Sequence, residues 1–141
     1  MPDLTWPNVE TLNAALAAGI RAANLRVNHI VAISRGGFVP ARLLATALGV
    51  RRLSSIGVSY EDAGRMTPTM WAPPAGLLAA DRVLLVEDAI ESGRSAMYAA
   101  EQIRPRVEAL FTAAYLRRPD SIAHLDFVVE VSAQLPRFPW E

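Results

Sequence analysis

Two adjacent acids and a nearby turn rich in serine and glycine are the residues of this sequence best suited to chemistry. Glu87 and Asp88 follow the apolar run Val83–Val86, and the turn Ser92–Ser95 then leads into an amphipathic segment. Adjacent carboxylates suit the hydroxyls of a sugar or a magnesium ion but bind phosphate poorly. The backbone N–H groups of a glycine turn at the start of a helix bind phosphate well. The stretch therefore predicts a ligand with a phosphate at one end and a sugar diol with a metal at the other, which describes a ribose phosphate.

A second candidate anion site is the segment Ser34–Gly37, which follows the apolar run Ile30–Ile33. Its paired glycines, Gly36 and Gly37, free the backbone to expose consecutive N–H groups, an arrangement that binds anions. Arg35 adds a planar cation whose geometry matches phosphate oxygens. The alternative is an ordinary strand-to-helix turn, in which glycine pairs are common.

Strands and helices alternate along the chain, in a pattern typical of an α/β fold with a mostly parallel sheet. Val83–Val86 is short, continuous and apolar, so we expect it in the centre of the sheet, covered on both faces. The remaining predicted strands are residues 27–33, 53–59, 107–116 and 126–131, and the predicted helices are residues 6–23, 40–48 and 96–103. Because ligands of open α/β sheets bind beyond the carboxyl ends of the strands, both candidate sites should lie along one edge of the sheet.

No periodic pattern fits residues 60–81, which mix polar side chains with scattered glycine, proline and methionine. An irregular connection of this length in a compact domain is usually a lid or a disordered segment. Its position between the two candidate phosphate loops favours a mobile lid that excludes water. The alternative is a surface excursion whose Trp71 packs on a partner subunit.

Length and composition indicate one folded domain over residues 1–141. The chain has 141 residues, 52% apolar content, no cysteine and a formal net charge of zero. A neutral chain has no global field to recruit nucleic acid or an anionic membrane, and no apolar run approaches the length of a membrane span. The lack of cysteine and of a recognisable signal peptide fits a cytoplasmic protein. The strongly basic side chains are all arginines, so no site within this sequence can use lysine.

Three stretches resemble the type I phosphoribosyltransferases, and in particular their purine (xanthine, guanine, hypoxanthine) branch. The segment Val83–Ser95 resembles the family's motif for 5-phosphoribosyl 1-diphosphate (PRPP), and Val31–Arg42 resembles its pyrophosphate-binding loop. The ending Phe138–Glu141 resembles the chain end of bacterial and archaeal members. The matches occur in family order and span the chain from about Trp6 to Glu141.

The resemblance implies an α/β fold with a central, mostly parallel sheet flanked by helices, a mobile loop at about residues 60–81 and a small C-terminal hood at about residues 132–141. A contribution of the amino terminus to the hood is left open. The implied reaction, a step of purine salvage, moves the 5-phosphoribosyl group from PRPP to a purine-type nucleobase and releases pyrophosphate, with Mg2+ as cofactor, in a homodimer. The Ser34–Arg35 peptide bond is expected to be cis. The implied PRPP site is Glu87, Asp88, Ala89, Ile90, Glu91, Ser92, Gly93, Arg94 and Ser95, and the implied pyrophosphate site is Ser34, Arg35, Gly36 and Gly37.

Three acids carry the implied catalytic roles. Glu87 and Asp88 would position the magnesium ion that binds with PRPP. Glu91 would accept or orient the proton of the attacking ring nitrogen. Relatives usually have aspartate at positions 87 and 91, so both glutamates keep the charge but lengthen the side chain by one methylene.

Arg118, Leu135 and Phe138 are the expected contacts to the base. Arg118 stands where the purine branch has a lysine before proline, and Leu135 stands where relatives place a stacking aromatic residue. Phe138 or Trp140 could supply that aromatic face instead. These departures keep two alternatives open: a protein of this fold that senses PRPP or nucleotides without catalysis, and an enzyme that acts on a modified base.

Overall fold

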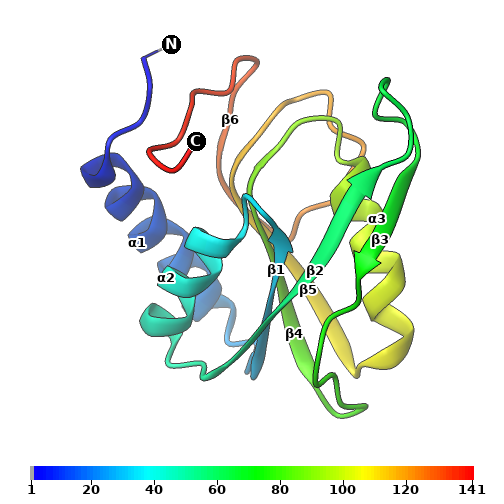
Figure 1. Ribbon diagram of the computed structural model, residues 1–141. Coiled ribbons are helices and arrows are strands. Elements are labelled where there is room, and N and C mark those ends of the chain that lie inside the picture. Colours follow the sequence, from blue (N-terminus) through cyan, green and yellow to red (C-terminus); the bar gives the residue numbers. More distant parts are fainter. Residues whose placement is uncertain (1) are drawn as a thin grey trace.

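The computed structural model describes residues 2–141. It contains one six-stranded sheet in the order β3-β2-β1-β4-β5-β6, in which only the edge strand β3 is antiparallel to its neighbour. The strands are β1 His29–Ser34, β2 Arg52–Tyr60, β3 Pro68–Ala72, β4 Arg82–Ile90, β5 Ala109–Arg117 and β6 Phe127–Val131; the helices are α1 Trp6–Ala23, α2 Phe38–Leu48, α3 Arg94–Ile103 and the 3-10 turn η1 Arg104–Arg106. Helices α1 and α2 cover one face of the sheet and α3 covers the other (Figure 1). The expected α/β fold is confirmed.

Strand β4 lies in the middle of the sheet, between β1 and β5, as the apolar run predicts. Val83, Leu84, Leu85 and Val86 are at most 2% exposed and alternate between the two cores. The strand does not end before the acids, however, because Glu87 and Ile90 still pair with β5 opposite Ala114 and Arg117. The prediction that the acids follow the strand is therefore wrong by a few residues, because both acids lie within β4, near its carboxyl end. Their side chains consequently have the fixed directions of a strand.

The ends of the first two helices follow from their capping residues. Thr5 and Asn8 form a reciprocal capping box at the start of α1, and Asn24 ends the helix with a left-handed backbone at φ 55°. Helix α2 begins at Phe38, two residues earlier than its proline suggested, and ends at Gly49 with φ 69°. A positive φ at these two ends favours asparagine and glycine, which is why the sequence marks both of them clearly.

The connection between residues 60 and 81 is not structureless, so that prediction is wrong. Pro68–Ala72 forms β3, which pairs antiparallel with β2 and makes a hairpin whose tip is Glu61–Thr67. A strand of five residues at the edge, beginning with proline, has little periodic signal of its own. Trp71 is 65% exposed and its ring lies against Gly57, where a Cβ atom would collide with it.

A buried polar cluster joins the amino ends of three parallel strands. Asp81, which is 1% exposed, accepts hydrogen bonds from Arg52 Nη2 at 3.0 Å and pairs with His29 Nδ1 at 3.1 Å. The other ring nitrogen of His29 contacts Ser54 Oγ at 2.8 Å. The Arg52 hydrogen bond is the main reason that the pKa of Asp81 lies below its ordinary value. The cluster fixes the sheet at the edge opposite the acids.

The carboxyl-terminal tail folds back against the start of α1 (Figure 1). Leu4 N donates to Arg137 O at 2.9 Å, and the rings of Trp6 and Trp140 lie 5.8 Å apart. The amino-terminal segment therefore packs on the predicted hood. Within residues 2–141, no helix has the length and apolar character needed to cross a membrane.

Candidate active site

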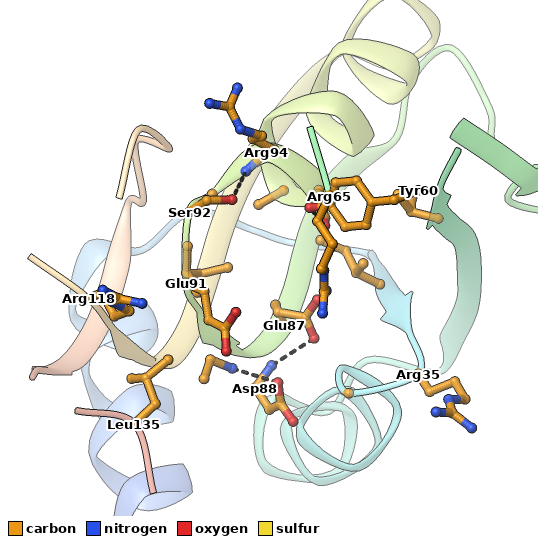
Figure 2. Close-up of a pocket in the computed structure, with 18 of the residues that line it drawn as sticks. Arg35, Tyr60, Arg65, Glu87, Asp88, Glu91, Ser92, Arg94, Arg118 and Leu135 are labelled. Atoms are coloured by element: carbon orange, nitrogen blue, oxygen red, sulfur yellow. Dashed lines mark hydrogen bonds between the residues drawn. The ribbon is translucent and has the colours of Figure 1, made fainter. Parts of the chain in front are cut away.

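A cavity of about 920 Å3 opens at the carboxyl ends of β1 and β4 (Figure 2). Its walls come from the loop after β1, the end of β4, the turn before α3, the β2–β3 hairpin and the tail. Every residue predicted for the site lines this cavity except Gly37: Ser34, Arg35, Gly36, Glu87, Asp88, Ala89, Ile90, Glu91, Ser92, Gly93, Arg94, Ser95, Arg118, Leu135 and Phe138. The sheet topology thus brings together segments more than 100 residues apart in the sequence, as the shared edge of parallel strands predicts.

The loop after β1 has the backbone expected of the pyrophosphate loop in one respect and differs in another. The Ser34–Arg35 peptide bond is cis, as the family resemblance implies. Gly37, in contrast, donates its N–H to Ile33 O at 2.9 Å, and a Cβ there would collide with the backbone of Val86. Gly37 therefore lets the loop pack on β4, and its N–H is used within the fold rather than kept for an anion.

The acidic pair is tightly held. Asp88 is 8% exposed; its Oδ1 accepts from Ala89 N at 2.6 Å and its Oδ2 accepts from the indole nitrogen of Trp140 at 3.0 Å. Glu87 Oε1 accepts from Asp88 N at 3.1 Å. Burial, and then the negative charge of Asp88, raise the pKa of Glu87 well above its ordinary value. A cation arriving at this pair would compensate both effects and favour the ionised form.

Gly36 is required by the position of Asp88. A Cβ atom on Gly36 would lie 2.6 Å from Asp88 Oδ1 and 2.7 Å from Oδ2. The backbone of the loop after β1 therefore passes directly over the carboxylate. The two sites predicted separately from the sequence touch one another through this pair.

The turn before α3 has the geometry of an anion site. Gly93 is the N-cap of α3 with φ 89°, and as a glycine it has no side chain to cap the helix. A Cβ on Gly93 would lie 2.6 Å from Ala123 N, so both the backbone angle and the available space call for glycine. Ser92 Oγ accepts from Arg94 N at 3.3 Å, which shapes the turn. The first turn of α3, with its N–H groups and the positive end of the helix dipole, lines the cavity and suits a phosphate.

Two hairpin residues that the sequence analysis did not single out also line the cavity. The hydroxyl of Tyr60 is hydrogen-bonded to Ser95 Oγ at 2.5 Å, and the guanidinium of Arg65 lies 5.0 Å from the centre of the Tyr60 ring. Figure 2 shows the Arg65 side chain directed inward, toward Glu87. The sequence indicated only that a cationic side chain in the site would have to be an arginine, because the chain has no lysine; it did not indicate which arginine.

The tip of the hairpin is organised by one acid. The carboxylate of Asp62 accepts from Met66 N at 3.1 Å and Thr67 N at 2.9 Å. The Thr67 hydrogen bond is the main reason that the pKa of Asp62 lies below its ordinary value. This turn places Arg65 in a left-handed conformation with φ 56°. Asp62 thereby sets the direction in which Arg65 leaves the backbone.

The far end of the cavity carries the residues predicted to contact the base. Arg118 lies at this end with 43% of its side chain exposed, while its Nε is buried 3.4 Å from Asp120 Oδ1. Leu135 is partly buried and offers an apolar surface. Phe138 is 3% exposed, with its ring stacked on Trp140 at 4.6 Å, so it packs the tail and presents little free face.

Glu91 is exposed and lies between the two ends of the cavity. Figure 2 shows its carboxylate directed into the cavity, toward the side that carries Glu87 and Asp88. This placement suits a group that exchanges a proton with a ligand bound between the two ends of the cavity.

The carboxylates of the cavity suit a metal ion that is bound partly by the protein and partly by the substrate. Within residues 2–141, no group of three or more His, Cys, Asp or Glu side chains could hold a metal ion alone. Magnesium is commonly bound by one or two carboxylates together with phosphate or hydroxyl oxygens of the substrate. Glu87 and Asp88 meet that requirement, and only they supply adjacent carboxylates at the base of the cavity.

The fold and this cavity define a phosphoribosyltransferase. The chain matches the family model described as the phosphoribosyl transferase domain over residues 4–140; it belongs to this family and is an enzyme of that class. The xanthine-guanine phosphoribosyltransferase of Gluconobacter oxydans (strain 621H) is 30% identical over 143 residues, covering 98% of this chain and 83% of that protein. The structure of a purine phosphoribosyltransferase from Pyrococcus horikoshii Ot3 is 29% identical, with a TM-score of 0.87 over 98% of this chain and 91% of that chain. A Helicobacter pylori xanthine-guanine-hypoxanthine phosphoribosyltransferase, 15% identical, shares the fold with a TM-score of 0.88 over 99% of this chain and 93% of that chain.

Proposed function

We propose that this enzyme transfers the 5-phosphoribosyl group from PRPP to a purine-type nucleobase and releases pyrophosphate. The observation that carries the proposal is that a single cavity holds the acidic pair, the start of α3, the cis loop and an apolar end with an arginine side chain. These four parts correspond to the four parts of the reaction: ribose, 5-phosphate, pyrophosphate and base.

Each part of PRPP has a matching element. The 5-phosphate binds at the turn Ser92–Ser95, where the N–H groups of the first turn of α3 lie at the positive end of the helix dipole. The ribose hydroxyls bind at Glu87 and Asp88. The pyrophosphate binds beside Arg35 and Gly36. Magnesium, when bound, neutralises the charge that develops on the departing pyrophosphate.

The β2–β3 hairpin acts as a lid that supplies positive charge and excludes water. Bond breaking at the anomeric carbon builds positive character on the sugar, as in glycoside hydrolysis, so water would compete with the base. Tyr60 ties the hairpin to Ser95, and Arg65 brings a cation over the acidic pair, toward the pyrophosphate. Fixed positive groups at that position stabilise the leaving group without reorganisation.

Glu91 is the proposed base of the reaction. Its exposed carboxylate faces the space between the ribose and base ends of the cavity. It would accept the proton that the ring nitrogen loses as the new glycosidic bond forms. Its longer side chain, relative to the aspartate usual in the family, lets it reach that proton from the end of β4.

The choice of a purine is supported by the names of the relatives and by the base end itself. The exposed part of the Arg118 side chain can donate to an exocyclic oxygen of the base, and Leu135 provides an apolar wall. A second function, a PRPP or nucleotide sensor without catalysis, is favoured by one observation. The tail rings of Phe138 and Trp140 stack on each other at 4.6 Å, so neither offers a free face to the base.

The decisive experiment follows pyrophosphate release from PRPP and Mg2+ with hypoxanthine, guanine, xanthine, adenine and a set of modified purines. Release with one or more ordinary purines, at rates well above hydrolysis, supports the proposal. Release with modified bases alone would redefine the substrate. Tight PRPP or nucleotide binding by calorimetry, with no release for any base, would favour the sensor and refute the proposal.

A further inference from the structure

The indole of Trp140 reaches from the carboxyl-terminal tail to the acidic pair. We propose that Trp140 is a positioning residue that sets the orientation of the Asp88 carboxylate and so couples the base end of the cavity to its ribose and metal end. This inference rests on the proposed function, because it assigns a task to a residue that supports the same site.

The contact itself is specific. Trp140 Nε1 donates to Asp88 Oδ2 at 3.0 Å, across 52 residues of sequence. Asp88 is 8% exposed, so few water molecules can replace this donor if it is lost. A buried carboxylate oxygen that loses its donor is costly, which makes the indole N–H a strong constraint on the rotation of the carboxylate.

The other contacts of Asp88 leave that rotation to Trp140. Its Oδ1 accepts from Ala89 N at 2.6 Å, a contact made by the adjacent backbone that fixes one oxygen only. The loop backbone at Gly36 closes one side, since a Cβ there would lie 2.6 Å from Oδ1 and 2.7 Å from Oδ2. The indole N–H is the side-chain donor that holds the second oxygen. Together these contacts define one plane for the carboxylate.

The indole is in turn held by the tail and by α1. Its ring stacks on Phe138 at 4.6 Å with an angle of 12°, and Trp6 packs on it at 5.8 Å. Glu141 closes the tail by accepting from Phe138 N at 3.1 Å. Leu135 lies on the same short tail and lines the base end. A shift of the tail on base binding would therefore be transmitted to Asp88 through a rigid aromatic stack.

The competing explanation is that Trp140 only packs. The two explanations depend on different atoms of the indole. Packing uses the faces and edges of the ring, whereas positioning uses the single N–H. Replacing Trp140 with benzothienylalanine keeps the shape of the ring and substitutes sulfur for the N–H. The same replacement at Trp6 is the matched control, since Trp6 contributes a ring to the stack but no hydrogen bond to Asp88.

The first test measures steady-state kinetics of both variants with PRPP, Mg2+ and the best base from the panel. Trp140→benzothienylalanine should lower kcat/KM for PRPP by about tenfold to a hundredfold, the range for one hydrogen bond to a buried charged group. The loss should appear in the KM for PRPP and in the Mg2+ concentration needed for half-maximal rate. Constants within twofold of the wild type at position 140, as expected at position 6, would overturn the inference.

The second test does not need turnover. The three tryptophans give three indole N–H signals in a 1H–15N spectrum. Asp88→Asn should shift the Trp140 signal and make its hydrogen exchange faster while leaving that of Trp71, on the edge strand, unchanged. Titration of the wild type with Mg2+ and PRPP should also move the Trp140 signal. A Trp140 signal that ignores both changes would refute the coupling, whether or not the protein releases pyrophosphate; absence of release alone would refute only the proposed function.

Discussion

Substitution of Gly36 by alanine tests the contact between the pyrophosphate loop and the acidic pair. The new Cβ would lie 2.6 Å from Asp88 Oδ1, whereas ordinary van der Waals contact begins at 3.4 Å. Gly36 does not have a positive φ, so the substitution adds volume without straining the backbone. Either the carboxylate or the loop must move by about 0.8 Å, the difference between these two distances.

The size of the effect follows from what the carboxylate would lose. A displacement of that size breaks its hydrogen bond to Ala89 N or to Trp140 Nε1. A hydrogen bond to a charged group contributes about 1.5–3 kcal/mol. At about 3 °C per kcal/mol for a chain of this size, Gly36→Ala should lower the melting temperature by about 5–10 °C. PRPP binding should weaken by about tenfold or more over the same range of free energy.

Calorimetric melting and PRPP titration in the presence of Mg2+ measure both effects. Gly19→Ala is the matched control, because a Cβ at Gly19 meets no atom within 4 Å and the residue lies within α1. That variant should melt at or slightly above the wild-type temperature. If Gly36→Ala melted like the wild type and bound PRPP equally well, the loop would not be packed on Asp88 and the reasoning would fail.

Three further predictions address the other groups of the site and the sheet. Glu91→Gln should lower kcat by about a hundredfold or more while the KM for PRPP stays within a factor of about three, as expected for loss of a general base; equal losses in both would show that the role is misassigned. Tyr60→Phe removes the hydroxyl bonded to Ser95 and should raise the KM for PRPP by about two- to tenfold, with more hydrolysis per transfer. Asp81→Asn should lower the melting temperature by about 5 °C at neutral pH, because Arg52 and His29 lose a charged partner. The folded-state pKa of Asp81 is depressed, so its stabilisation is present above the unfolded value of about 3.9 and is lost as pH falls below it. Melting curves from pH 7 to pH 2 should therefore converge for the variant and the wild type, and parallel curves would contradict the assignment.

The parts of the fold that could be predicted are those with local causes. The central strand is marked by its apolar run, and the ends of α1 and α2 are marked by Asn24 and Gly49, which take positive φ. The strand β3 could not be predicted, because its pairing with β2 rather than its own pattern defines it. The extension of β4 through Glu87 has the same cause, since the partner strand β5 supplies the hydrogen bonds.

The site, like the fold, has parts with local causes and parts that depend on contacts between distant segments. The acidic pair and the two glycine loops could be predicted because parallel strands end at one edge and the residue types indicate the chemistry. Glu91, Arg118, Leu135 and Phe138 came from the family resemblance alone. Contacts between distant segments were not predictable, such as Trp140 with Asp88 or Tyr60 with Ser95. The role of Phe138 is another example, since its burial in the tail depends on stacking partners that no sequence pattern specifies.

The raised pKa of Glu87 has a consequence for how the binding of magnesium and PRPP depends on pH. Burial and the charge of Asp88 favour the protonated form of Glu87, and a cation at the acidic pair favours its ionised form, so binding of magnesium with PRPP should be accompanied by proton release. Apparent affinity should then climb as the medium becomes more alkaline and level off once Glu87 ionises unaided.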